Sequence, residues 1–424
     1  MCYTRQLDSF FSQKRRTDAD YWRSFGVESP PMFFGSQEGM FRIFPGRHFE
    51  NCGSFDPRVR PWYIAASSGP KNIVLVLDTS GSMAGERFVL LKKAAIRVIQ
   101  TLTVGDRVAI VPFASSSLVI GDSEGRMLTA NAENKAILVD AINGLVARGG
   151  TNFYAALGSA FDTMDKTIAA ELHNNCNSAV LFLTDGEMTD PSDVTEQDVI
   201  ELVTNRLNAT MQSSGKPILF FTYSIGTANE NVHKFPKELA CSTELGVWSK
   251  IDDESKLFES LTSYYRLFAL GLGNKGAVAW VEPYNFATGG VVGTTVSAPV
   301  YDRNHDPPLF LGVVGMNFPL NAINKALGSE SGNQQAAIDR IVKASTANCP
   351  SLNLTLCELE SFRRLSSAGD EAICDLSACS SSDFVQVEAT KCPSVSDYPQ
   401  YLWINSNFAG KSYLVSNPSP SAVL

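Results

Sequence analysis

An unbroken apolar run that ends on an aspartate constrains the fold of this chain more than any other feature. Residues 73–83 read Ile-Val-Leu-Val-Leu-Asp-Thr-Ser-Gly-Ser-Met, so an apolar segment leads directly into Asp78. Such a run predicts a strand that is buried on both faces of a parallel sheet. Asp78 then lies at the carboxyl end of that strand, where open α/β sheets bind their ligands.

Composition narrows the class of protein. The chain has 424 residues, which predicts two or more domains. A hydrophobic content of 44% and a charged content of 19% are ordinary for a folded protein. The net charge of −9 and the lack of a basic run argue against a nucleic-acid partner. The sequence also has no apolar segment of the ~18 residues that a membrane span needs.

Strand-like and helix-like segments alternate across residues 72–270. This alternation predicts an α/β fold, with a doubly wound, mostly parallel sheet covered by helices on both faces. The predicted strands are Ile73–Leu77, Arg107–Phe113, Ala179–Leu183 and Ile218–Ile225. The predicted helices are Arg87–Leu102, Asn131–Leu145, Phe153–Met164, Asn231–Ala240 and Glu254–Leu270.

The segments on either side differ from this pattern. Residues 32–44 and 278–317 are strand-like and punctuated by glycine, which predicts two β-rich flanks that pair into one α+β domain around an inserted α/β domain. The expected division is 1–71, 72–270 and 271–345, followed by a Cys- and Ser-rich tail over 346–424.

Cysteine usage bears on the compartment. Five of the nine cysteines crowd the tail: Cys349, Cys357, Cys374, Cys379 and Cys392. Their clustering predicts disulfides, because no Cys-x2-Cys or paired histidines accompany them as a zinc site would require. Two glycosylation sequons begin at Asn208 and Asn353. Together these features favour an extracellular or luminal location, and the lack of a visible signal or anchor predicts a fragment or an incomplete gene model.

Three segments of the α/β region carry the ligands of a predicted metal site. Asp78, Ser80 and Ser82 come from the first loop, Thr151 follows Gly149-Gly150, and Asp185 follows the strand Ala179–Leu183. In a parallel sheet these loops share one edge. Oxygen donors of this kind suit Mg²⁺, Mn²⁺ or Ca²⁺ better than zinc, and they leave a coordination position open. The alternative is an aspartate that only caps a helix.

The motif Asp-x-Ser-x-Ser, with Thr151 and Asp185, resembles the metal-ion-dependent adhesion site of the von Willebrand factor A domain. The resemblance implies a divalent cation, Mg²⁺ or Ca²⁺, whose open position accepts a carboxylate from a partner protein. Within the same domain we predict a disulfide between Cys176 and Cys241, which adjacent strands could bring together; the alternative is two free buried thiols.

The flanks resemble a Cache sensor domain. This resemblance rests on four segments: Arg60-Pro61-Trp62-Tyr63, Trp280–Tyr284, Val296–Tyr301 and Gly312–Gly315. A Cache domain interrupted by a von Willebrand A domain is the arrangement of the voltage-gated calcium channel alpha-2/delta subunits, which residues 30–320 resemble. The tail is then either the start of a second Cache lobe or a degenerate C-terminus.

This second resemblance implies a small-ligand pocket. Arg60 matches the arginine that holds a ligand carboxylate, and Trp62 and Tyr284 match aromatic walls. Two positions depart from the family, since a pocket tyrosine is Phe55 here and the aspartate that pairs with a ligand amine is Asn317. The pocket therefore takes an anionic or neutral molecule, an amino acid held more weakly, or nothing. The alternative role for Arg60 is a structural ion pair.

Three classes of function follow. The leading one is a non-enzymatic regulatory subunit that binds a membrane protein, such as a calcium-channel pore subunit, through a carboxylate at the metal, with an amino-acid-like ligand in the flanking domain. The second is an extracellular adhesion or small-molecule-sensing protein with no channel role. The third, an enzyme, lacks a nucleophile elbow, a Walker loop, a zinc motif and a dinucleotide fingerprint.

Overall fold

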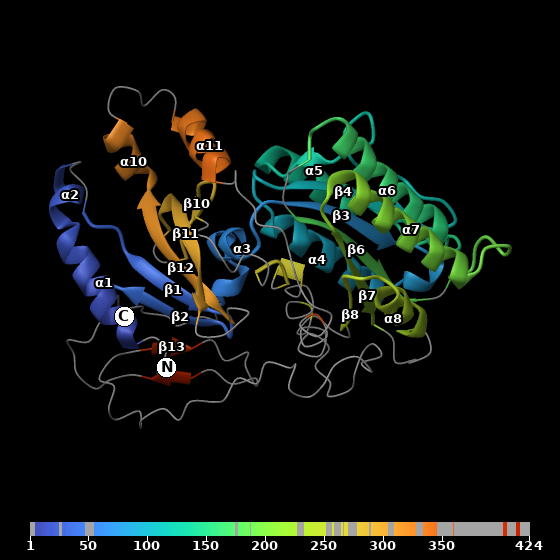
Figure 1. Ribbon diagram of the computed structural model, residues 1–424, viewed down its shortest axis with the longest axis horizontal. Helices are drawn as coiled ribbons and strands as arrows, with labels where there is room; N and C mark the ends of the chain where they lie inside the picture. The colour runs from blue at the N-terminus through green and yellow to red at the C-terminus, as the bar shows by residue number, and fades with distance from the viewer. Residues whose placement is uncertain are drawn as a thin grey trace. The chain divides into compact units, whose positions relative to one another are not determined.

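The computed structural model divides the chain into two compact units (Figure 1). One contains Met1–Ser67, Gly273–Asn348 and Val387–Leu424, and the other contains Ser68–Leu272 and Cys349–Gln386. The structure describes residues 5–24, 28–46, 55–173, 177–186, 188–226, 233–251, 257, 264–265, 267–269, 278–287, 290–303, 309–327, 334–345, 359, 402–404 and 413–415. Most of the predicted helix Glu254–Leu270 and of the tail 346–424 lies outside these residues.

The second unit is built on a six-stranded sheet in the order β5-β4-β3-β6-β7-β8. Its strands are β3 (Lys71–Asp78), β4 (Arg107–Phe113), β5 (Leu128–Thr129), β6 (Asn177–Thr184), β7 (Ile218–Ile225) and β8 (Gly246–Ile251). All neighbouring pairs are parallel except β4 with β5. The prediction of an α/β domain with a mostly parallel sheet is confirmed.

Helices cover both faces of this sheet, with α6 and α7 in front of it and α4 behind it in the view of Figure 1. The helices are α4 (Glu86–Thr101), α5 (Ala132–Gly144), α6 (Phe153–Ala169), α7 (Glu196–Ser214) and α8 (Lys234–Cys241). The short 3-10 helix η3 (Gly81–Met83) follows β3. Neither α7 nor the strands β5 and β8 belong to the predicted set.

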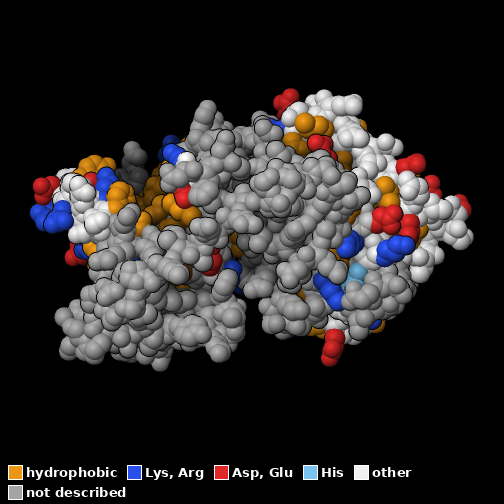
Figure 2. Space-filling view, turned by 60° about the horizontal axis from the view of Figure 1, so that its bottom comes forward, with side chains coloured by type: hydrophobic (Ala, Val, Ile, Leu, Met, Phe, Trp, Pro, Cys, Tyr) orange, Lys and Arg blue, Asp and Glu red, His pale blue; other side chains and the backbone are white. Residues whose placement is uncertain are grey.

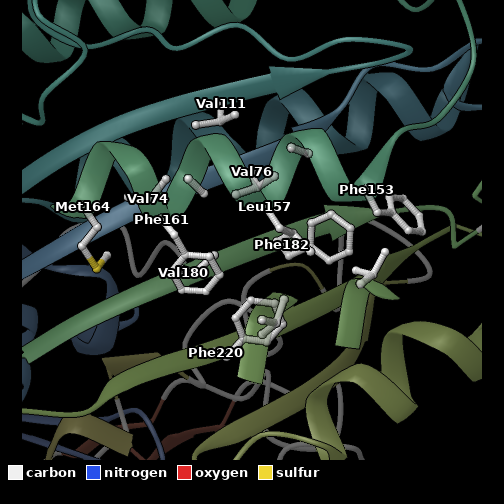
Figure 3. Packing of buried hydrophobic residues seen from close by; sticks show 14 of the residues in the cluster. Val74, Val76, Val111, Phe153, Leu157, Phe161, Met164, Val180, Phe182 and Phe220 are labelled. Carbon is white, nitrogen blue, oxygen red and sulfur yellow. The ribbon is translucent and has the colours of Figure 1, made fainter. Parts of the chain in front are cut away.

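The strand β3 lies at the centre of the core. All its residues are buried, including Val74 and Val76, which join a cluster with Phe161 of α6 and Phe182 of β6 (Figure 3). Because side chains alternate along a strand, the residues between them face the opposite side of the sheet. Burial on both faces explains why the run is apolar throughout, as the sequence predicts.

The first unit contains an eight-stranded antiparallel sheet in the order β10-β11-β12-β1-β2-β13-β14, with β9 paired to β11. Its strands are β1 (Met32–Ser36), β2 (Met40–Phe44), β9 (Ala279–Trp280), β10 (Tyr284–Asn285), β11 (Val292–Asp302), β12 (Leu309–Pro319), β13 (Leu402–Ile404) and β14 (Tyr413–Val415). Since β1 pairs with β12, segments from before and after the α/β unit share one sheet.

Alternation along β1 places aromatic side chains on both faces of this sheet. Phe34 packs in a cluster with Phe11 of α1, whereas the ring of Phe33 lies 4.7 Å from that of Trp62 in α3. The helices of this unit are α1 (Arg5–Thr17), α2 (Ala19–Ser24), the 3-10 helix η2 (Pro57–Val59), α3 (Pro61–Ser68), α10 (Leu320–Leu327) and α11 (Gln334–Ser345). Within the part of the chain that the structure describes, no helix is both long and apolar enough for a bilayer span.

Candidate metal centre

Asp78 ends β3 and is completely buried, yet both of its carboxylate oxygens have donors. The backbone N–H of Ser80 donates to Oδ1 over 2.9 Å, and the Thr184 hydroxyl donates to Oδ2 over 2.7 Å. Thr184 is the last residue of the neighbouring parallel strand β6, so its hydroxyl and Asp78 lie at the same sheet edge. These contacts fix the orientation of the carboxylate before any ligand arrives.

Burial changes the acidity of this carboxyl group. Desolvation raises the pKa of Asp78 from its ordinary 3.8 to about 6, although the hydrogen bonds from Ser80 and Thr184 oppose the shift. A carboxylate in this position is stabilised by a nearby positive charge, which offsets the cost of removing it from water. The group therefore suits a role as a cation ligand near neutral pH.

The loop after β3 presents the two serines of the motif. Ser80 is buried and Ser82 is exposed within η3, and their hydroxyl oxygens lie 2.9 Å apart. The loop is tied to the segment before Thr151, since Gly81 N–H donates to Gly149 O over 2.9 Å and Arg148 N–H donates to Thr79 O over 2.8 Å. The structure thus brings the first two motif segments side by side.

Thr151 is buried between Gly150 and the start of α6. Its N–H donates to the Thr189 hydroxyl over 2.8 Å, and its carbonyl accepts from the N–H groups of Thr189 and Asp190. A Cβ on Gly150 would lie 1.8 Å from Oδ2 of Asp190, so the Asp190 side chain lies directly against this glycine. The loop after β6 therefore packs directly over the Gly-Gly segment, which joins the second and third motif segments.

Asp185 is buried with one oxygen paired and the other without a partner. Oδ2 accepts from Nη1 of Arg87 over 3.1 Å, and Oδ1 has no hydrogen-bond partner among the residues that the structure describes. A buried carboxylate oxygen without a donor is costly, and a metal ion or a metal-bound water is a natural partner for it. This orphaned oxygen beside Asp78 is the observation by which the residues fit a divalent cation.

The donor set differs from that of a transition-metal site. Among the described residues there is no group of three or more His, Cys, Asp or Glu side chains that could hold a metal. The candidate centre combines two carboxylates with the hydroxyls of Ser80, Ser82 and Thr151. A set of hard oxygen donors with few charges favours Mg²⁺ or Ca²⁺, with water completing the coordination.

Two residues of this centre are missing from the sequence prediction, Thr184 and Arg87. Thr184 directly precedes Asp185 at the polar end of an apolar strand, so its position is a usable signal for a residue that supports Asp78. Arg87 lies in the first turn of α4 and has no local sequence signal, because its partners come from three separate loops. Its role emerges only from the tertiary structure.

The first unit contains the residues of the predicted small-ligand pocket. The Arg60 guanidinium lies 5.7 Å from the centre of the Tyr284 ring and 5.9 Å from that of Phe55, and its Nη2 donates to Asn285 O over 3.0 Å. Arg60 and Tyr284 are therefore brought together. Trp62 is buried instead among aromatic rings that include Phe33, as a core residue is.

A chain of hydroxyls connects Tyr284 to Asn317. The Thr295 hydroxyl donates to Oδ1 of Asn317 over 2.6 Å and lies 2.6 Å from the Tyr284 hydroxyl. Because Thr295 has one hydroxyl proton, Tyr284 must be the donor to Thr295. Burial raises the pKa of Tyr284 to about 12, although the Thr295 hydrogen bond and the Arg60 charge lower it, so its phenol keeps that proton.

Of the two cysteines in the predicted disulfide, the structure describes only Cys241. Cys241, at the end of α8, is disulfide-bonded. Cys176 lies outside the described residues, as do the five tail cysteines and the Asn353 sequon, so the Cys176–Cys241 pairing stays a prediction. Asn208 of the other sequon is exposed on α7.

Charged side chains are mixed on the face shown in Figure 2. The Lys and Arg side chains of the described residues form small separate groups there, next to Asp and Glu. Such mixing is typical of a solvated protein surface.

Known proteins resemble this chain in two ways. A family model described as a von Willebrand factor type A domain matches residues 73–187. The voltage-dependent calcium channel subunit alpha-2/delta-2 of Mus musculus is 28% identical over 337 residues, which cover 76% of this chain and 27% of that protein. The alpha-2/delta-3 subunit of Rattus norvegicus is 26% identical over 310 residues, which cover 70% and 27%.

The chain spans about a quarter of the length of these curated relatives, since 27% of each is covered. Among solved structures, a von Willebrand factor type A protein from Catenulispora acidiphila matches 69% of this chain and 66% of its own at 18% identity and a TM-score of 0.38.

Proposed function

Because the chain contains a von Willebrand factor type A domain and resembles alpha-2/delta subunits over 76% of its length, we propose that it is a non-enzymatic, divalent-cation-dependent protein-binding subunit. Asp78, Ser80, Ser82, Thr151 and Asp185 hold Mg²⁺ or Ca²⁺ directly or through water. The cation supplies a Lewis-acidic position that a carboxylate of the partner can occupy.

The main support for this proposal is the state of the two buried carboxylates, Asp185 and Asp78. Asp185 keeps an unpartnered, buried oxygen next to the loop of Asp78, whose own pKa is raised to about 6 by burial. Two buried carboxylates at one sheet edge repel each other unless a positive charge lies between them. A divalent cation accounts for both features at once.

The partner is a membrane protein, with a calcium-channel pore subunit as the specific candidate. The resemblance to proteins named as calcium channel subunits supports this choice. The binding face is the sheet edge formed by the loops after β3 and β6 and by the loop before α6. Ser82 is an exposed residue of this edge, which leaves the edge accessible to a partner side chain.

The surrounding domain and the location belong to the same proposal. The β1–β12 pairing supports a Cache-like domain into which the A domain is inserted. A disulfide-bonded Cys241 supports placement on the extracellular face of a membrane or in the secretory lumen, where disulfides persist, and the exposed side chain of Asn208 is compatible with it.

Thermal unfolding of the full chain in Mg²⁺, Ca²⁺ and EDTA tests the metal site. We expect Mg²⁺ or Ca²⁺ to raise the Tm of the wild type and to leave that of Asp78→Ala unchanged. A wild-type Tm that EDTA does not alter would refute the site. A pull-down from a membrane fraction, with and without EDTA, then tests the partner, and capture that EDTA does not reduce would contradict cation-dependent binding.

The hydroxyl chain in the first unit favours a second candidate function, the sensing of a small molecule. Arg60 would hold a carboxylate next to the Tyr284 ring, while Asn317 offers hydrogen bonds but no charge to the rest of the ligand. Calorimetry with a panel of amino acids tests this function, and a lack of heat at millimolar ligand would exclude it.

A further inference from the structure

The side chain of Arg87 lies where three loops of the metal-site edge meet. It projects from the first turn of α4, and its Nε donates to Gly226 O over 3.0 Å. Its Nη1 donates to Oδ2 of Asp185 over 3.1 Å and to Ser82 O over 3.2 Å. These three acceptors follow β7, β6 and β3, which are consecutive neighbours in the sheet.

We propose that Arg87 is a positioning residue for the divalent cation, an inference that rests on the proposed metal function. By holding Oδ2 of Asp185, the guanidinium fixes the carboxylate so that the unpartnered Oδ1 remains available for the cation or its bound water. By holding Ser82 O as well, it keeps the loop that carries the serine ligands in register with the loop of Asp185.

The backbone at Gly226 gives separate evidence that the loop after β7 is shaped around the Arg87 side chain. This glycine has a φ of +51°, and a Cβ at this position would lie 3.3 Å from Cγ of Arg87. The residue therefore gives room to the arginine stem while its carbonyl accepts from Nε. Since L-residues rarely adopt this backbone conformation, glycine serves both the turn and the contact.

Charge and position predict opposite effects for the loss of Arg87. A guanidinium is always protonated, so its charge repels a divalent cation at the adjacent site. If charge alone mattered, removing it would tighten cation binding. If the three-loop contact orients Asp185, removing it would weaken binding in spite of the lost repulsion. Lysine keeps the charge but lacks the planar fork that reaches three acceptors.

The test is a Mg²⁺ titration of the full chain by calorimetry. We expect Arg87→Met and Arg87→Lys each to raise the Kd for Mg²⁺ by about tenfold, as loss of a residue that orients a metal ligand typically does. Gly226→Ala should weaken binding in the same direction without any change in charge. A Kd for Arg87→Met equal to or below that of the wild type would overturn the inference.

Arg206→Met is the matched control, because Arg206 pairs with Asp162 and Asp165 between α6 and α7 and its loss changes the charge equally. Its Kd should stay within about twofold of the wild type, because Arg206 is already paired with two carboxylates and solvent ions screen partly exposed charges. Hydrogen exchange in EDTA is the second readout. Arg87→Met should speed exchange at Gly186 N–H, and unchanged exchange there would contradict the positioning role.

These outcomes separate the two proposals. A wild type that does not bind Mg²⁺ or Ca²⁺ refutes the proposed metal function and this inference with it. A wild type that binds, with no weakening in any of the Arg87 and Gly226 variants, refutes only the inference. If Arg87→Met fails to fold, Arg87→Lys and Gly226→Ala decide the question in its place.

Discussion

Lys71 and Asp106 form a completely buried ion pair at the end of β3 opposite to Asp78. Nζ of Lys71 lies 3.1 Å from both Oδ1 and Oδ2 of Asp106. The carboxylate also accepts from the backbone N–H of Lys71 over 3.0 Å and from that of Thr103 over 2.6 Å. The pair fixes where β3 begins, and β3 in turn carries Asp78 to the edge of the sheet.

Removal of Asp106 should destabilise the protein more than removal of Lys71. Asp106→Ala leaves a buried ammonium without its carboxylate and costs about 3–5 kcal/mol of unfolding free energy. Lys71→Met leaves the carboxylate with its backbone donors and should cost less. Urea denaturation of both variants measures the difference, and a larger loss for Lys71→Met would show that the backbone contacts of Asp106 contribute little.

The acidity of Asp78 sets the pH dependence of stability without metal. Its pKa is about 6 in the folded protein and 3.8 ordinarily, so the folded state keeps a proton that the unfolded chain releases. Stability from this group is present below pH 3.8 and is lost as the pH rises through about 6, an effect on the order of 3 kcal/mol. Asp78→Asn in EDTA should lack this component of the decline, and a decline equal to that of the wild type would contradict the shifted pKa.

Cation binding should show the reverse trend with pH. Because a cation requires the ionised carboxylate, protonation of Asp78 below its pKa of about 6 competes with binding. The Kd for Mg²⁺ should be nearly constant above pH 7 and about tenfold weaker at pH 5 than at pH 7. Calorimetric titrations at pH 5, 6, 7 and 8 measure it, and a Kd that does not vary with pH would exclude Asp78 as a ligand that titrates in this range.

Thr184→Val tests whether the Thr184 hydroxyl stabilises the ionised carboxylate of Asp78. The substitution removes the hydroxyl that donates to Oδ2 of Asp78 and that accepts from Gly186 N–H. We expect a further rise in the pKa of Asp78, weaker Mg²⁺ binding at pH 7, and a loss of about 1–3 kcal/mol of stability from the unpaired N–H.

The control for Thr184→Val is Thr222→Val. The Thr222 hydroxyl is buried within β7 and donates to Pro236 O over 2.8 Å. Its loss should lower stability and leave the Kd for Mg²⁺ unchanged. Equal weakening of Mg²⁺ binding by both variants would mean that Thr184 acts only through general stability.

Local patterns predict the four inner strands of the α/β unit, β3, β4, β6 and β7, because those strands are buried on both faces, whereas the edge strands β5 and β8 are missed. The predicted strand Arg107–Phe113 matches β4, and Ile218–Ile225 matches β7. The helix α7 is harder to predict, since Val199, Ile200, Val203 and Thr210 are its only buried residues and its apolar stripe is narrow. Its capping box of Thr195 and Asp198 is the signal that the apolar pattern does not provide.

The candidate site also contains residues that a local sequence pattern predicts and residues that it does not. The motif residues Asp78, Ser80 and Ser82 lie close together in sequence, so their pattern alone indicates a cation site. Arg87, which joins loops that are 98 and 139 residues away along the chain, depends on sheet order and helix placement. Long-range contacts of this kind follow from packing, which a local sequence pattern does not specify.

Asn317→Asp tests whether the charge at residue 317 determines which ligands the first unit binds. The Thr295 hydroxyl donates to Oδ1 of Asn317 and could donate equally to a carboxylate, so the substitution should fold. The added charge would give a ligand amine a charge-assisted partner and should strengthen amino-acid binding, by about 1–3 kcal/mol if the site is desolvated. Calorimetry with an amino acid and with the matching carboxylic acid that lacks the amine measures this gain. Arg60→Met should abolish binding of both ligands, and a gain that is equal for both would contradict an amine-specific role for residue 317.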